Sequence, residues 1–113
     1  FIDLRAARVR EVILDGNDIT EGAITLDEKG YDPTHGVALR DLTAGEHTLR
    51  ITADCEYSRT GQGLHRFVDP ADGETYLYTQ FETADAKRVF ACFDQPDLKA
   101  RYKLTVHTPD NWK

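Results

Sequence analysis

The sequence predicts a mostly β fold, either a β-sandwich or a curved open antiparallel sheet, with one short helix. Several short segments alternate apolar and polar residues or are rich in β-branched side chains, as strands half-buried against a core do. Turn signals containing glycine separate these segments at fairly regular spacing. Only the stretch after Thr83 carries a helix start signal, so one short helix is expected among the strands.

The first predicted strand covers residues 9–14, which are rich in β-branched side chains. It runs into Asp15 and Gly16, a pair that favours a tight turn because glycine accepts positive φ. We therefore expect a hairpin near Asp15, with residues 23–26 as its second or third arm. After a loop marked by glycine and proline, residues 37–39 are expected to start another short strand.

The clearest strand pattern of the first half lies at residues 47–53. Leu49, Ile51 and Ala53 would share one face, and the polar residues between them would share the other. Residues 57–73 are dense in glycine, aspartate and other polar residues, which predicts an extended loop rather than a regular element. Loops of such length often carry function.

A further alternating segment, residues 75–82, leads into the predicted helix. Its alternation would place Gln80 and Glu82 on the same strand face. Thr83 is a suitable N-cap, because its hydroxyl can accept a hydrogen bond from an exposed amide of the first turn. Asp85 lies where the helix dipole favours an anion. We expect a helix of about two to three turns here.

Residues 94–97, Asp-Gln-Pro-Asp, are expected to end that helix, since proline disfavours the helical conformation in the residue before it. Residues 100–107 alternate again, which predicts a final strand. No internal repeat or low-complexity stretch interrupts the chain. Residues 1–113 are therefore expected to form part of one β-domain.

The composition narrows the classes of function. The chain has 113 residues, of which 40% are hydrophobic and 30% charged, as in globular domains. A formal net charge of -6 disfavours nucleic acid as a partner, because phosphate contacts require clustered lysine and arginine. No apolar run approaches the roughly 20 residues that cross a bilayer, so no membrane partner is predicted. Cys55 and Cys92 form no C-x-x-C pair, and we expect two free thiols and a cytoplasmic location.

Common catalytic and metal-binding motifs do not occur in the sequence. No H-E-x-x-H segment is present, and the four histidines include no pair at ligand spacing. No G-x-S-x-G segment is present either, and the glycines at residues 61–63 are typical of a turn rather than of a phosphate loop. We therefore expect no catalytic residue, no metal ligand and no bound cofactor within these 113 residues.

Gln80 and Glu82 remain as the candidate site residues. They would place an amide and a carboxylate on one strand face just before the start of the predicted helix. The pattern alone favours a solvated strand end, because most exposed acids serve only solubility.

A functional role for Gln80 and Glu82 is favoured instead by the segment that contains them, residues 76–100, YLYTQFETADAKRVFACFDQPDLKA. This segment is similar, in the same order, to the T-Q-x-E, D-A-R-R, F-P-C-F-D-x-P and K-A blocks of the aminopeptidase N family, the M1 family of zinc metallopeptidases. Residues 63–70, GLHRFVDP, resemble a block seen in actinobacterial members of that family. Ala91 stands where the family usually has proline, and Gln95 where many members have glutamate. Neither departure touches the TQFE segment.

The resemblance implies roles for the two candidate residues. Glu82 matches the carboxylate that pairs with the α-ammonium group of a peptide substrate, and Gln80 matches the amide that lines the pocket for the first side chain. The family's zinc helix and G-A-M-E-N segment belong to a later domain. Residues 1–113 would then be a partial N-terminal β-domain of a zinc aminopeptidase, without the catalytic zinc domain and inactive alone.

The same resemblance implies two partners, a peptide with a free N-terminal amine and the catalytic domain of the same chain. Because the sequence starts at Phe1 and contains no methionine, we expect it to be an excerpt of a longer chain. Two other functions stay open: a non-catalytic interaction scaffold that retains this domain, and a free-standing β-sandwich binding module. The TQFE segment argues against a scaffold, which would need no carboxylate for an amine.

Overall fold

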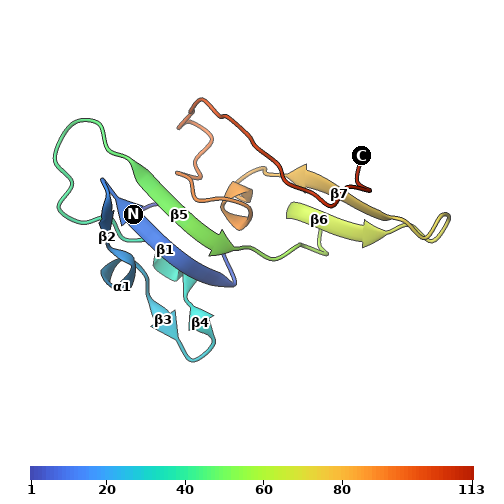
Figure 1. The fold of residues 1–113 in the computed structure, drawn as a ribbon, viewed down its shortest axis with the longest axis horizontal. Helices are drawn as coiled ribbons and strands as arrows, with labels where there is room; N and C mark the ends of the chain where they lie inside the picture. The colour runs from blue at the N-terminus through green and yellow to red at the C-terminus, as the bar shows by residue number, and fades with distance from the viewer.

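Short strands and tight turns account for most of the regular structure in the computed structural model, which describes residues 1–113 (Figure 1). The strands pair antiparallel in three open sheets, of order β2-β1-β5, β3-β4 and β6-β7. The predicted mostly β fold with an open antiparallel sheet is therefore confirmed. The elements are β1 (Arg8–Leu14), β2 (Asn17–Asp18), α1 (Thr20–Ala23), β3 (Leu26–Asp27), β4 (Gly30–Tyr31), the 3-10 turn η1 (Pro33–His35), β5 (Leu49–Asp54), β6 (Gly63–Val68), β7 (Thr75–Gln80) and the 3-10 turn η2 (Ala86–Arg88).

The β1 strand is the centre of the three-stranded sheet. It turns into β2 through Asp15 and Gly16, whose φ angles of 50° and 84° are the left-handed values that a two-residue hairpin turn requires. On its other side β1 pairs with β5, with a register shift between Val9 and Glu11. The hairpin predicted near Asp15 and the strand predicted at residues 47–53 are both confirmed.

The hydrophobic core lies beneath this sheet. Val12 and Val37 are fully buried, and Leu4 is nearly so. Full burial of one such side chain stabilises the fold by about 1.5 to 3 kcal/mol. The hydroxyl of Tyr31 enters the core and donates a hydrogen bond of 2.9 Å to the Leu4 carbonyl. Burial raises the pKa of Tyr31 to about 12, so the phenol keeps its proton. The seven core residues are Ile2, Leu4, Val9, Val12, Ala23, Tyr31 and Val37.

The N-terminal segment links this core to the part of the chain that follows β7. Ile2 forms an antiparallel bridge with Val37, and Asp3 forms one with Cys92. The amide of Arg5 donates a hydrogen bond of 2.7 Å to the Lys87 carbonyl. Segments distant in the sequence are thus held together by residues 2–5.

Two strands predicted in the first half are wrong. Residues 23–26 are not an arm of the first hairpin, because α1 ends at Ala23 and β3 starts only at Leu26. The Asp18 carboxylate accepts hydrogen bonds from the Thr20 amide and hydroxyl, at 2.9 and 2.6 Å, in a local turn that separates β2 from α1. Residues 37–39 form no strand beyond the single bridge at Val37.

The extended loop predicted at residues 57–73 is also wrong. It contains β6, which pairs with β7 over six residue pairs, from Gly63 opposite Gln80 to Val68 opposite Thr75. In Figure 1 these two strands form a ribbon that extends to one side of the three-stranded sheet.

The last two predicted elements are shorter than expected or missing. Only η2 follows Thr83, and the Lys87 amide donates to the Asp94 carboxylate at 3.0 Å instead of to a helical carbonyl. The strand predicted at residues 100–107 is wrong, since this segment is exposed and pairs with no other strand. No helix of the chain has the length and apolar character that crossing a bilayer requires.

Candidate functional site

Gln80 and Glu82 lie where the β6–β7 ribbon ends. Gln80 is the last residue of β7 and pairs with Gly63, the first residue of β6. Glu82 lies two residues further on, outside the strand, so the prediction that the strand reaches residue 82 is wrong. Strand alternation therefore does not set the direction of its side chain. Both residues are exposed.

One hydrogen bond brings the two candidate residues together. The backbone amide of Glu82 donates to the side-chain oxygen Oε1 of Gln80 at 3.3 Å. This contact orients the Gln80 amide toward the backbone that carries Glu82. The Glu82 carboxylate takes part in no hydrogen bond or ion pair within the chain. It is therefore free to accept hydrogen bonds from a ligand.

At the end of the ribbon, Gly63 packs against η2. Gly63 is buried, has a φ of +69°, and would bring an added Cβ to 2.8 Å from the Cβ of Arg88. Arg88 is itself held by Asp85, with 2.8 Å between Nε and Oδ1, and only 28% and 15% of these two side chains is exposed. Close packing at Gly63 thus fixes the backbone beside Gln80.

A second set of contacts holds η2 to the N-terminal segment. The Asp94 carboxylate accepts from the Lys87 amide, and the Asp94 amide donates to the Asp3 carboxylate at 3.1 Å. Cys92 exchanges two backbone hydrogen bonds with Asp3. Partial burial, together with the charges of Asp94 and Asp3, raises the pKa of the Cys92 thiol to about 11. The thiol is therefore protonated at neutral pH and acts as a packing group.

The residues of this chain do not fit a metal site. Nowhere in residues 1–113 do three histidine, cysteine, aspartate or glutamate side chains gather in an arrangement that could hold a metal ion. Two of the histidines already use their ring nitrogens within the fold: His47 contacts Asp15 and the Thr43 carbonyl, and His65 accepts from the Gly61 amide.

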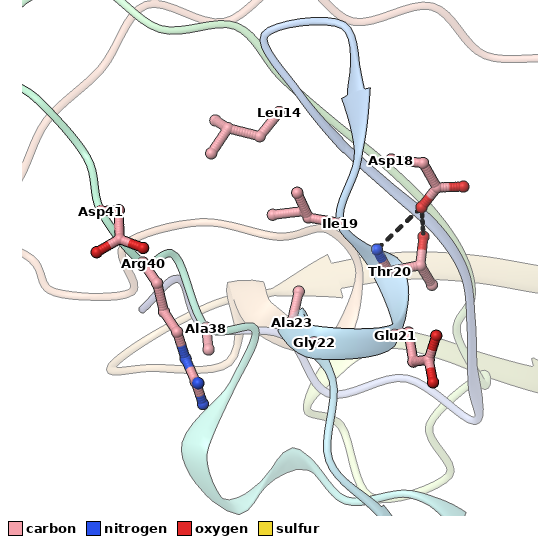
Figure 2. Close-up of a pocket in the computed structure, with 10 residues that line it drawn as sticks. All are labelled: Leu14, Asp18, Ile19, Thr20, Glu21, Gly22, Ala23, Ala38, Arg40 and Asp41. Atoms are coloured by element: carbon pink, nitrogen blue, oxygen red, sulfur yellow. Dashed lines mark hydrogen bonds between the residues drawn. The ribbon is translucent and has the colours of Figure 1, made fainter.

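A groove beside α1 lies apart from Gln80 and Glu82 (Figure 2). Its volume is about 650 Å³, and its apolar wall comes from Leu14, Ile19, Ala23 and Ala38. The Asp18 and Thr20 side chains at its edge are bonded to each other. The groove adds no group to the candidate site.

A row of aromatic side chains on the ribbon was not predicted from the sequence. It consists of His65, Phe67, Tyr76 and Tyr78. The glycine and aspartate content of residues 57–73 indicates a loop, and a loop predicts no cross-strand pairing with β7. The alternation of His65 and Phe67, matched by that of Tyr76 and Tyr78 after the turn, was the available signal.

Comparison with known proteins decides the family. Residues 3–112 match the family described as the peptidase M1 N-terminal domain. The chain belongs to this family. The resemblance drawn from residues 63–100 is thereby confirmed, and the ribbon, η2 and the N-terminal segment are parts of an M1 N-terminal domain.

Relatives of this M1 N-terminal domain occur in bacteria, plants and archaea. The chain is 50% identical to aminopeptidase N of Streptomyces lividans over 112 residues, which are 99% of the chain and 12% of the relative. It is 40% identical to aminopeptidase M1-A of Oryza sativa subsp. japonica over 70 residues, 60% of the chain and 8% of the relative. It is 45% identical to probable aminopeptidase 1 of Saccharolobus solfataricus over 47 residues, 42% of the chain and 6% of the relative. The chain thus spans 12% or less of the length of these three relatives.

Proposed function

We propose that this M1 N-terminal domain is the substrate-binding part of a zinc-dependent aminopeptidase that removes N-terminal residues from peptides. Residues 1–113 would form part of its N-terminal β-domain and would be inactive alone. Zinc and the catalytic groups belong, in this proposal, to the rest of the enzyme, and the catalytic domain of the same chain is the protein partner. Family membership and the 50% identity to an aminopeptidase N support the assignment. The unpaired thiols of Cys55 and Cys92 favour the cytoplasm.

Within that enzyme, Glu82 binds the α-ammonium group of the substrate, and Gln80 lines the pocket for the first side chain. The observation that carries this proposal is the exposed, unpaired Glu82 carboxylate, whose own amide is bonded to Gln80. A carboxylate and an ammonium group form a charge-assisted hydrogen bond, worth about 1.5 to 3 kcal/mol. The pair thus offers one contact for the amine and one for the adjoining side chain.

This arrangement explains how an aminopeptidase measures the end of its substrate. An ammonium group fixed at Glu82 places the first peptide bond at a constant distance from the carboxylate. Internal peptide bonds lack that charge and gain nothing from the contact. The contribution of the domain to catalysis is therefore positioning, which lowers the barrier by holding the reacting bond in place.

The test is Glu82→Gln in the full-length enzyme, with kcat/KM measured on a peptide with a free N-terminus. We expect a fall of about tenfold or more, because the substitution keeps the shape of the side chain and removes its charge. Glu74→Gln is the matched control. Glu74 is exposed, directly precedes β7 at the far end of the strand, and loses the same charge.

Unchanged kinetics in Glu82→Gln would remove Glu82 from the site. A fall of equal size in Glu74→Gln would assign the effect to net charge rather than to a contact. A full-length protein that hydrolyses no free-amine peptide would favour the scaffold function over an enzyme.

A further inference from the structure

Four aromatic residues form two cross-strand pairs on one face of the β6–β7 ribbon, which we call the aromatic ladder. His65 lies opposite Tyr78, with 4.8 Å between ring centroids. Phe67 lies opposite Tyr76, with stacked rings and 5.5 Å between centroids. Phe67 also meets Tyr78 edge-on at 6.2 Å, so the two pairs form one continuous surface.

Three of the four side chains are exposed, and His65 is half-buried. Phe67, Tyr76 and Tyr78 are 39%, 42% and 46% exposed, and none of the seven buried core side chains comes from the ribbon. If the rings served only to stabilise the pairing of the two strands, burying them would stabilise the fold more than leaving them exposed does. A contiguous apolar surface that remains exposed is typical of a binding face.

Two of the four rings are also held in place by hydrogen bonds within the ribbon. The Nδ1 atom of His65 accepts a hydrogen bond of 2.9 Å from the Gly61 amide. The hydroxyl of Tyr76 donates to the Asp72 carboxylate in the turn between the strands. Rings that are already ordered lose little conformational entropy on binding, which favours their use as contact residues.

The aromatic ladder leads directly to the candidate site. Tyr76, Tyr78 and Gln80 follow one another at every second position of β7, so their side chains share a face. Gly63, opposite Gln80, adds no side chain on β6 at this position. Successive side chains on one face of a strand lie about 7 Å apart, and an extended peptide presents its own alternate side chains at the same repeat.

We propose that the aromatic ladder binds apolar and aromatic side chains of the peptide substrate downstream of its first residue. The inference rests on the proposed function, because the first residue is taken to lie at Gln80 and Glu82. An extended peptide that starts there reaches the His65–Tyr78 pair with its third residue and the Phe67–Tyr76 pair with its fifth. The enzyme would then favour peptides of five or more residues with large apolar side chains at those positions.

The test compares two substrates in the full-length enzyme. One is a leucine anilide, which has no third or fifth residue, and the other is a hexapeptide with leucine first and phenylalanine third and fifth. In the double variant Tyr76→Thr, Tyr78→Thr, threonine keeps the β preference of the strand and removes both rings. We expect kcat/KM for the hexapeptide to fall about fivefold to tenfold, and that for the anilide to stay within about twofold of wild type.

Two controls make the result specific. The double variant Tyr76→Phe, Tyr78→Phe keeps both rings and is expected to retain hexapeptide cleavage. Tyr57→Thr removes a tyrosine of 56% exposure that lies outside the aromatic ladder, and both substrates should be cleaved as by wild type.

Equal losses for both substrates would overturn the inference, because the rings would then serve the ribbon rather than the peptide. Unchanged cleavage of both would overturn it too. A third outcome would also overturn it: the double threonine variant differs from wild type in molecular mass in solution, but the ratio of the hexapeptide rate to the anilide rate is unchanged. A second copy of the chain would then cover the rings. An anilide rate that does not respond to Glu82→Gln would instead overturn the proposed function.

Discussion

At the residue scale, the candidate site depends on where the strand ends. The sequence predicted both Gln80 and Glu82, but it placed them on one strand face. In the structure the strand ends at Gln80, and a hydrogen bond from the Glu82 amide to the Gln80 side chain joins the two residues instead. Alternation cannot predict such a bond, because it depends on the backbone after the strand. The sequence therefore predicts which residues are candidates, but not how the backbone places them relative to each other.

His47 offers a test of local electrostatics at the other end of the fold. Its Nδ1 atom lies 2.6 Å from Asp15 and its Nε2 atom lies 2.7 Å from the Thr43 carbonyl, so both nitrogens face acceptors. Only the protonated ring donates to both. The hydrogen bond to Asp15, then that to Thr43, raises the pKa of His47 above its usual value.

A folded-state pKa above the unfolded value of about 6.5 means that this contribution to stability is complete below that pH. It is lost as the pH rises through the raised pKa of the folded state. The free energy of unfolding of wild type should therefore exceed that of His47→Gln by more near pH 6 than near about pH 9. Urea unfolding of the full-length protein at both pH values measures this difference. His107→Gln, at an exposed position, is the control and should show no such change. A difference for His47→Gln that is the same at both pH values would contradict the role given to the protonated ring.

At the element scale, strands with a half-buried face were predictable and the others were not. β1, β5 and most of β7 follow from β-branched content or alternation, because one face of each packs against neighbours. β6 was missed because glycine and aspartate around it indicated a loop. The predicted helix after Thr83 is reduced to η2, since the Asp94 side chain binds the Lys87 amide, which a longer helix would bond to a backbone carbonyl. Such tertiary contacts leave no periodic signal.

The contact between β6 and η2 predicts an unequal cost for two similar glycine substitutions. Gly63 and Gly73 have φ angles of +69° and +71°, so alanine is strained by the backbone to the same extent at both. Only at Gly63 would the new Cβ lie 2.8 Å from Arg88, whereas nothing lies within 4 Å at Gly73. Gly63→Ala should lower the free energy of unfolding by about 1 to 3 kcal/mol more than Gly73→Ala does. Equal losses in urea unfolding would show that Arg88 yields freely.

At the scale of the whole molecule, the first third of the chain supplies the core and the last half supplies the candidate site. All seven core residues lie between Ile2 and Val37, and the N-terminal segment joins that core to η2. Sequence patterns predicted the fold class but not this division, because the bridges from Ile2 and Asp3 involve single residues far apart in the chain. The motifs of residues 76–100 were sufficient to indicate the family. The structure adds that Gly63, which pairs with Gln80, packs against Arg88 of η2, and that the Glu82 amide is bonded to Gln80.

A crystal structure of the full-length enzyme with a bound peptide would test the claim that Glu82 binds the free amine of a peptide. The measured quantity is the distance from the peptide's α-nitrogen to the Glu82 carboxylate. A charge-assisted hydrogen bond predicts a separation of about 2.7 to 2.9 Å, with the first side chain beside Gln80. An α-nitrogen bound to other groups, with Glu82 facing solvent, would contradict the claim.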